Sequence, residues 1–209
     1  MKKKLALIVF AAIATFAFAE SAVNIAAVEM FGYVPHTIEG QNHTCYKQNY
    51  GVSADYVYIC DNGFSLGFNF SYYGSNIQDK SSLYNVPVIS DFKGNGFSIA
   101  PNFGWSFKGK SSLVQILLNP FVIENLTYNT IVYTAYPAIG PQYLGTDFKK
   151  VEYNSFKSGL NASLEWGWEH FKLGLGAGIY GVILDSYNGE MAPCLGVDVS
   201  LIEKITFLF

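Results

Sequence analysis

Five charged side chains share a face of their segments with small polar residues, opposite a row of large apolar side chains. They are Asp55, Lys157, Glu165, Lys172 and Asp198. If these positively and negatively charged side chains face the same enclosed space, they could line a path for protons or ions. Alternatively, they could form ion pairs that fill the space. Glu165 and Lys172 flank one tight turn, so we expect them to form a diagonal pair across two strands.

A second group of reactive residues lies in the segment 34–48, which contains His36, Glu39, His43 and Cys45. Zinc or copper could use such side chains. Their spacing, however, matches no structural zinc site. We therefore predict no metal ion and no cofactor.

Alternation with a period of two residues indicates that β-strands position these side chains. Large apolar residues alternate with Ser, Gly, Asn and Ala in four segments, 64–74, 97–107, 156–168 and 171–181. Weaker alternation adds four strands at 22–33, 49–60, 112–124 and 192–209. Eight strands are an even number, and they predict an all-β fold that closes as an antiparallel up-and-down barrel.

The expected connections alternate between short and long. Tight turns are expected at 61–63, 108–110 and 169–170, and longer loops at 34–48, 75–94, 125–152 and 185–191. This layout, with both chain ends on the side of the short turns, is typical of a transmembrane barrel with periplasmic turns and extracellular loops.

Four residues conflict with regular strands. Pro101 and Pro120 lie inside expected strands, where proline removes a hydrogen-bond donor, so we expect a break or bulge at each. Asn24 and Glu29 have opposite parity in the first strand. Either a bulge lies between them or one of them faces the wrong side.

The first nineteen residues read as a secretory signal peptide, which would be cleaved to leave a barrel domain at 20–209. Lys2 to Lys4 provide the positive region, 5–16 the apolar region, and Ala17 and Ala19 the small residues of a cleavage site. The sequence contains no arginine and no basic stripe, so nucleic acid is excluded as a partner.

The two faces of the strands differ in a way that identifies the surrounding solvent. A soluble barrel would carry many Lys and Glu side chains outside, whereas here the polar face is small and nearly uncharged. The large apolar face would therefore contact lipid. Aromatic residues gather beside the short turns and predict a girdle at the periplasmic lipid interface: Trp105, Phe107, Trp166, Trp168, Phe171, Phe207 and Phe209.

With its signal sequence, eight-strand plan and terminal segment 205–209 (ITFLF), the chain resembles the small eight-stranded outer-membrane proteins, the class of the OmpA transmembrane domain, OmpX and OmpW. This architectural resemblance covers the whole mature chain. It implies a bacterial outer-membrane location, loops at the cell surface, contact with lipid, and recognition of Phe209 by the barrel-assembly machinery. Glu203 departs from the pattern, because it interrupts the apolar series before Ile205.

Closure of such a barrel would make the first and last strands neighbours. Cys45 in the first outer loop and Cys194 at the outer start of the last strand could then form a disulfide in an oxidising compartment. Cys60 lies at the opposite end and should stay free.

Three functions are open for a chain of this kind. The first is a surface protein whose outer loops contact host or environment, or which has a structural role. The second, implied by the OmpW resemblance, is a narrow channel for small hydrophobic molecules, with the aromatic loop 126–148 as a lid or binding surface. The third is a lipid-modifying enzyme; no serine motif accompanies the three histidines, so we predict no enzyme.

Overall fold

Nine β-strands make up almost all of the chain that the computed structural model describes, residues 20–38, 41–83, 86–137, 140–187 and 190–209. The predicted signal peptide lies outside these residues. The strands are β1 (Glu20–Ile38), β2 (Gln41–Ile59), β3 (Phe64–Leu83), β4 (Val86–Lys108), β5 (Ser112–Ala135), β6 (Gln142–Asp147), β7 (Val151–Gly167), β8 (Phe171–Tyr187) and β9 (Glu190–Leu208).

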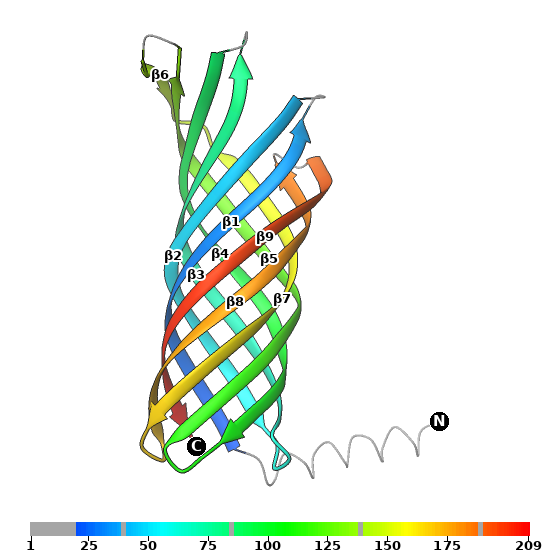
Figure 1. Cartoon of the computed structure of the whole chain (residues 1–209), viewed down its shortest axis with the longest axis vertical. Coiled ribbons are helices and arrows are strands. Elements are labelled where there is room, and N and C mark those ends of the chain that lie inside the picture. The colour runs from blue at the N-terminus through cyan, green and yellow to red at the C-terminus, as the bar shows by residue number, and fades with distance from the viewer. Residues whose placement is uncertain (1–19, 39–40, 84–85, 138–139, 188–189) are drawn as a thin grey trace, which may run out of the picture.

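Eight of these strands form a closed antiparallel ring, which confirms the predicted up-and-down barrel (Figure 1). Each long strand pairs with its neighbour in sequence, and β1 pairs with β9 from Ala22–Leu208 to Tyr33–Val197 to close the ring. The ninth strand, β6, pairs with β5 at the point where the β5–β7 ladder has ended. It therefore extends one hairpin and is not a ninth wall of the barrel.

The three short turns lie together at the lower end of Figure 1, near the C-terminus. At the first turn Cys60 donates to the carbonyl of Phe64 and Gly63 donates to the carbonyl of Cys60, each at 2.8 Å. Gly63 has a φ of 81°, which glycine adopts without steric cost. The turns predicted at 61–63, 108–110 and 169–170 are confirmed.

The predicted long loops at the other end are wrong, because most of their residues are in strands. Residues 34–48 and 75–94 continue the ladders of β1 with β2 and of β3 with β4, and β5 extends to Ala135. Similarly, 185–191 falls largely within β8 and β9. Their polar and aromatic composition reflects strands that leave the membrane while they stay paired.

Both proline positions coincide with an irregularity in the sheet, as predicted. The β4–β5 register shifts between Ile99 and Phe103, and the β5–β7 register shifts between Asn119 and Val122. The second shift reverses the parity of β5. Odd-numbered residues point inward before Pro120, and even-numbered residues point inward from Val122 to Tyr128.

The first strand contains no such shift in either of its ladders. Asn24 is fully buried inside, and Glu29 therefore faces outward. Apart from Glu203, the rest of the outer face is largely apolar across the middle of the barrel, with exposed side chains such as Ile25, Val52, Phe68, Phe70, Leu118, Phe121, Leu160, Leu175 and Leu201. Among the described residues, no helix is long and apolar enough to span a membrane.

Candidate functional site

Two lysines and two carboxylates form a buried cluster in the half of the barrel nearer the long hairpins; we term it the upper ion-pair layer. Lys47 Nζ lies 2.8 Å from both Glu124 Oε2 and Asp198 Oδ2, and Lys157 Nζ lies 2.7 Å from Glu124 Oε2. Lys157 also contacts Asp198. All four side chains are at most 1% exposed, and their charges cancel.

Neutral donors complete the coordination of Glu124. Its carboxylate accepts hydrogen bonds from Tyr73 Oη at 2.9 Å, Ser155 Oγ at 2.8 Å and Asn49 Nδ2 at 3.3 Å. Together with the ion pairs, these bonds connect β2, β3, β5, β7 and β9 across the lumen. The layer therefore links strands that are not adjacent in the ring.

The expected polar residues Lys157 and Asp198 do meet here, whereas Lys47 and Glu124 were missed. Lys47 fell in an expected loop, although it continues the alternating inward series of Asn49, Ser53 and Asp55. Glu124 lies beyond the Pro120 bulge, where strict alternation would point it outward. Pro120 itself was the sequence feature that could have indicated a bulge, and with it the inward orientation of Glu124.

A lower ion-pair layer, formed by Glu165 and Lys204, lies nearer the short turns. Lys204 Nζ lies 2.6 Å from Glu165 Oε1 and donates to Gln115 Oε1, also at 2.6 Å. The predicted pair between Glu165 and Lys172 is wrong, because Lys172 Nζ instead donates to the carbonyl of Trp168 at 2.9 Å. That carbonyl lies in the adjoining turn, whereas the Glu165 carboxylate on the neighbouring strand β7 pairs with Lys204 of β9.

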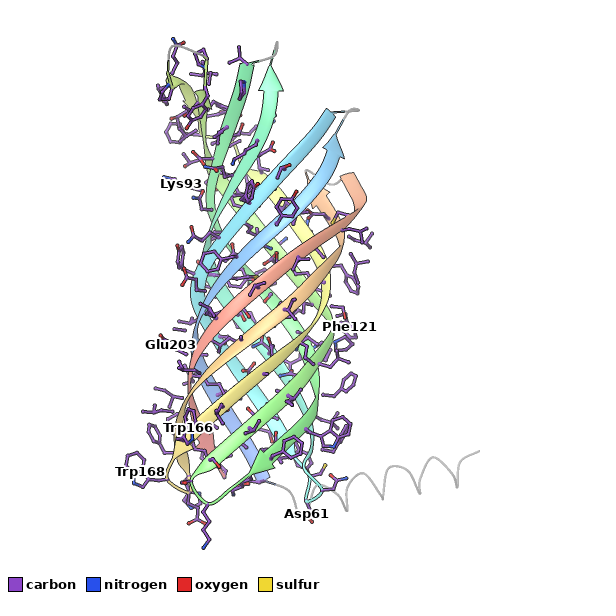
Figure 2. All side chains as sticks on the ribbon, viewed as in Figure 1. Asp61, Lys93, Phe121, Trp166, Trp168 and Glu203 are labelled. Atoms are coloured by element: carbon purple, nitrogen blue, oxygen red, sulfur yellow. The ribbon has the colours of Figure 1, made fainter. Side chains whose placement is uncertain are left out.

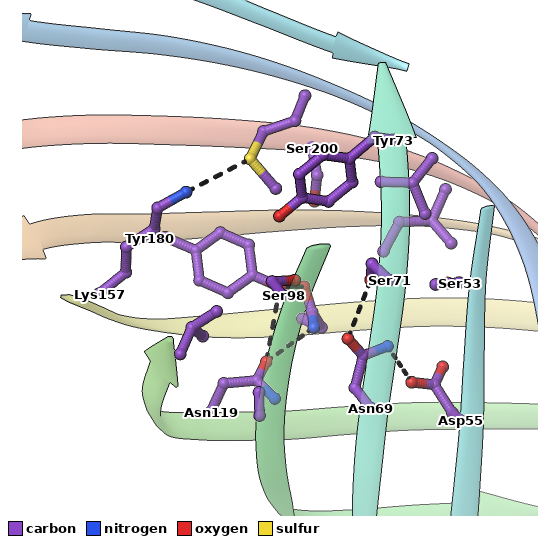
Figure 3. A pocket seen from close by; sticks show the side chains of 16 residues that line it. Ser53, Asp55, Asn69, Ser71, Tyr73, Ser98, Asn119, Lys157, Tyr180 and Ser200 are labelled. Carbon is purple, nitrogen blue, oxygen red and sulfur yellow. Dashed lines mark hydrogen bonds between the residues drawn. The ribbon is translucent and has the colours of Figure 1, made fainter. Parts of the chain in front are cut away.

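A cavity of about 50 Å³ separates the two layers (Figure 3). Asp55 points into it and accepts a hydrogen bond from Asn69, which in turn accepts one from Ser71 Oγ at 3.0 Å. On another side Tyr180 Oη donates to Asn161 Oδ1 at 2.6 Å. Asp55 is thus hydrogen-bonded to the side-chain amide of Asn69 and lies outside both ion-pair layers.

Apolar side chains occupy the lumen beside each layer. Around the lower layer, in the half of the barrel nearer the short turns, Ala22, Val57, Ile59, Leu113, Leu117 and Leu208 form one buried apolar cluster. Above the upper layer a larger cluster includes Val34, Ile77, Phe92, Leu126, Tyr128, Ile131, Val151 and Tyr153. The described interior is therefore a packed core with two charged layers, as expected for a barrel of eight strands.

The predicted Cys45–Cys194 disulfide is not formed, since neither sulfur atom is bonded to another cysteine in this structure. Both side chains point into the upper apolar cluster. They come from β2 and β9, which lie on opposite sides of β1, so a full strand separates them. Cys60, half-buried at the first turn, is not part of a disulfide either.

The aromatic residues expected in the girdle are on the outer face at the end with the short turns, where Figure 2 shows Trp166 and Trp168. Trp105, Trp166 and Trp168 are more than half exposed. Phe171 packs edge-on against Phe207, with ring centroids 5.6 Å apart, and Trp168 lies 6.0 Å from Phe171. Phe107 and Phe209 are also exposed at this end.

The hairpin of β5 and β6 forms an exposed site at the opposite end. Figure 1 shows β6 above the hairpins of β1–β2 and β8–β9. Tyr143 is 66% exposed, Leu144 54% and Phe148 81%. Within the described sheet β6 pairs only with β5, so its outer edge carries unpaired backbone donors and acceptors.

Two charged residues lie at the base of this hairpin. Lys150 Nζ donates to Glu152 Oε1 at 2.7 Å, and both are solvent-exposed. This hydrogen bond and the lysine charge hold the pKa of the Glu152 carboxyl below its usual range.

The candidate metal ligands of the first loop lie only partly among the described residues. The side chains of His36, Glu39 and His43 are outside them, whereas Cys45 is buried in the upper cluster. Among the residues whose side chains are described, no three His, Cys, Asp or Glu side chains are placed to hold a metal ion. His170 is at a short turn, 3.2 Å from the carbonyl of Leu208.

The sequence matches no family model and no curated protein. Solved structures of similar architecture include Ail, the attachment invasion locus protein of Yersinia pestis, at 12% identity over 92% of this chain and 99% of Ail, with a TM-score of 0.44. Neisserial surface protein A is 8% identical over 90% of this chain and 96% of its own, with a TM-score of 0.41. The translocator domain of the autotransporter NalP from Neisseria meningitidis is 8% identical over 99% and 97%, with a TM-score of 0.37.

The geometry of this chain itself identifies its class. A closed ring of tilted antiparallel strands, an apolar outer face and a polar interior are the features of a small β-barrel of the bacterial outer membrane. The chain has this fold and this location, with its long hairpins at the cell surface.

Proposed function

We propose that this protein is a surface receptor or adhesin of the outer membrane, which contacts a macromolecule of the host or environment through the β5–β6 hairpin. One observation supports this proposal most directly. Large apolar side chains are exposed to water on this hairpin, which together with the β3–β4 hairpin extends beyond the β1–β2 and β8–β9 hairpins. Exposed apolar patches of this kind tend to mark interaction sites.

The free edge of β6 adds a second mode of contact. An extended segment of a partner could pair with β6 and continue the sheet, with backbone hydrogen bonds for affinity and side-chain contacts for specificity. Tyr143 and Leu144 on β6 would then lie beside the added strand. A protein partner fits this surface better than a small solute, because the hairpin has an edge and two faces rather than a pocket.

The interior favours this function over the channel for small hydrophobic molecules. A hydrophobic solute would have to displace the upper apolar cluster and then cross two layers of buried ion pairs. Removing one partner of a buried ion pair costs about 3–5 kcal/mol, and a solute would separate several at once. We therefore interpret the charged residues as a structural plug.

Contacts with lipid and with the assembly machinery complete the proposal. The aromatic girdle would lie at the periplasmic interface of the outer membrane, where amphipathic rings are favoured. Phe209, 74% exposed at the closing seam, would be available to the barrel-assembly machinery. Its backbone exchanges two hydrogen bonds with Ser21, at 2.9 and 3.1 Å.

Adhesion of bacteria that produce the protein tests this function. Cells with the wild-type protein should bind to immobilised extracellular-matrix proteins or cultured epithelial cells more strongly than cells without it. The combined change Tyr143→Ser, Leu144→Ser and Phe148→Ser should reduce this binding about tenfold, since these are the three most exposed large apolar residues at the hairpin.

A matched variant changes neighbouring residues that are exposed but polar. Lys149→Ser with Lys150→Ser should leave adhesion within twofold of wild type. Equal adhesion of the triple variant and the wild type would contradict a role for the hairpin. Conductance of the purified protein in planar bilayers, together with uptake of a hydrophobic solute into vesicles, would instead support the channel.

A further inference from the structure

Two carboxylates lie on the membrane-facing surface at the seam between β1 and β9. Glu203 is exposed on the outer face, in the middle of the series Leu201, Glu203 and Ile205 (Figure 2). Glu29, on the neighbouring strand, faces the same side. Because Glu203 pairs with Ala27 and Glu29 pairs with Leu201, the two glutamates are diagonal neighbours across the seam.

The position of Glu203 along β9 places it within the hydrocarbon. It lies four residues above Phe207 of the aromatic girdle. At about 3.3 Å per residue and a tilt of about 45°, that separation is about 9 Å along the membrane normal. The apolar band of such barrels is about 25 Å tall, so Glu203 lies roughly a third of the way across it. Glu29, level with Leu201 and two residues farther along the seam, lies near its middle.

None of the described basic side chains lies on this patch. Lys47, Lys157, Lys172 and Lys204 are buried in the lumen. The remaining described lysines are exposed near the two ends of the barrel, at positions 80, 93, 108, 110, 149 and 150. Glu203 therefore faces hydrocarbon with no cation of the described chain on its side of the wall, an arrangement that is costly and typically functional.

The surface around Glu203 is hollowed. A groove of about 460 Å³ runs beside it, lined on the outer face by Ile25, Ala27, Val52, Leu173, Leu175 and Ile205. The small side chain of Ala27, directly opposite Glu203, forms the floor. A side chain of a neighbouring protein could enter this groove and reach the carboxylate, as small residues permit close approach in membranes.

We infer that this seam is a docking surface for a membrane-embedded polypeptide that presents a lysine or arginine side chain at mid-bilayer depth. Charge complementarity specifies the partner: the cation would lie between Glu203 and Glu29, with its aliphatic stem in the groove. A second copy of this chain fits poorly, because it would bring the same acidic face against this one. The surface is separate from the β5–β6 hairpin and does not depend on its function.

A defined membrane peptide tests the docking surface. The probe is a helix of about 20 leucine and alanine residues with one central lysine, labelled with an acceptor fluorophore. The refolded full-length protein carries a donor on Cys60, which is accessible at the periplasmic turn while Cys45 and Cys194 are buried. In phosphatidylcholine vesicles, energy transfer should show at least fivefold stronger association with the lysine peptide than with a peptide carrying central norleucine.

Substitutions at the seam identify the groups responsible. Glu203→Gln keeps the shape of the side chain and should reduce association with the lysine peptide at least fivefold, and Glu29→Gln should reduce it further. Glu152→Gln, an exposed change far from the seam, should have no effect. Folding of each variant is checked by its heat-dependent mobility on gels.

Three results would overturn the inference. The first is equal association of the lysine and norleucine peptides with the wild-type barrel. The second is equal association of the lysine peptide with the wild type and with Glu203→Gln. The third is donor-to-acceptor transfer between barrels without peptide that is lost in the Glu29→Gln and Glu203→Gln double variant, because this would assign the seam to a second copy.

Discussion

Replacement of Glu124 by glutamine should destabilise the barrel more than any surface substitution. The wild-type carboxylate is fully buried and interacts with two ammonium groups, Lys47 at 2.8 Å and Lys157 at 2.7 Å. Glutamine has nearly the same shape, and its single amide oxygen can replace one of the two carboxylate oxygens that accept from Tyr73 and Ser155. At the other position, the hydroxyl must turn to accept from the amide NH2 group. The main effect of the change is therefore the loss of one negative charge from a layer whose charges cancel.

The magnitude follows from the charge that remains. After Glu124→Gln, two buried lysines share the single carboxylate of Asp198, so one positive charge is uncompensated. Breaking a buried ion pair in this way costs about 3–5 kcal/mol. We expect about 4 kcal/mol, because Asp198 still contacts both lysines. This value corresponds to an increase of about a thousandfold in the equilibrium constant of unfolding.

Reversible unfolding by urea in phospholipid vesicles provides the measurement. Trp105, Trp166 and Trp168 are all on the outer face near the short turns, so their fluorescence reports loss of contact with lipid. Extrapolation of the unfolding free energy to zero urea gives the difference between variant and wild type.

Two further variants make the test specific. Glu152→Gln removes a carboxylate of a solvent-exposed ion pair and should change stability by less than about 1 kcal/mol. Adding Lys47→Met to Glu124→Gln removes the surplus positive charge and should recover at least about 1.5 kcal/mol. The reasoning fails if Glu124→Gln costs under about 1 kcal/mol, or if the double variant is no more stable than the single one.

Three other outcomes are expected. Gly32→Ala should destabilise by about 1–3 kcal/mol in the same urea assay, because its Cβ would lie 2.2 Å from Asp198 Oδ1, whereas Gly74→Ala, with its closest contact at 4.0 Å, should be tolerated. Deletion of Phe209 should lower the fraction of folded barrel in the outer membrane, measured by gel mobility without heating; unchanged assembly would contradict its role. Lipids brominated near the headgroup should quench Trp166 fluorescence more than lipids brominated at the chain ends.

The barrel itself could be predicted from the sequence because period-two alternation is a local property. The segments 64–74 and 156–168 show large apolar residues on one parity and small polar ones on the other, and both lie in the ring as expected. Alternation becomes weaker where strands leave the membrane, because neither face then needs to be apolar. Paired strands such as the upper part of β4 consequently looked like loops.

The charged core could be predicted only in part because pairing is not local. Lys47 and Asp198 are 151 residues apart in sequence, and alternation shows that each faces inward without showing which groups meet. The bulge beside Pro120 limited the prediction of the charged core still more than the distance in sequence did. One extra residue in β5 reverses the parity of the strand from Val122 to Tyr128, so Glu124 points into the lumen against the regular pattern.

The position of Asp198 on the last strand makes barrel formation cooperative. Until β9 pairs with β1, Lys47 and Lys157 lack one of their two carboxylates and Glu165 lacks Lys204, so a seven-stranded intermediate would bury an unpaired charge in each layer. Such an intermediate is penalised relative to both the open chain and the closed ring. The last strand therefore closes the ring of hydrogen bonds and also supplies the charges that neutralise both ion-pair layers. Barrel closure is consequently an all-or-none step.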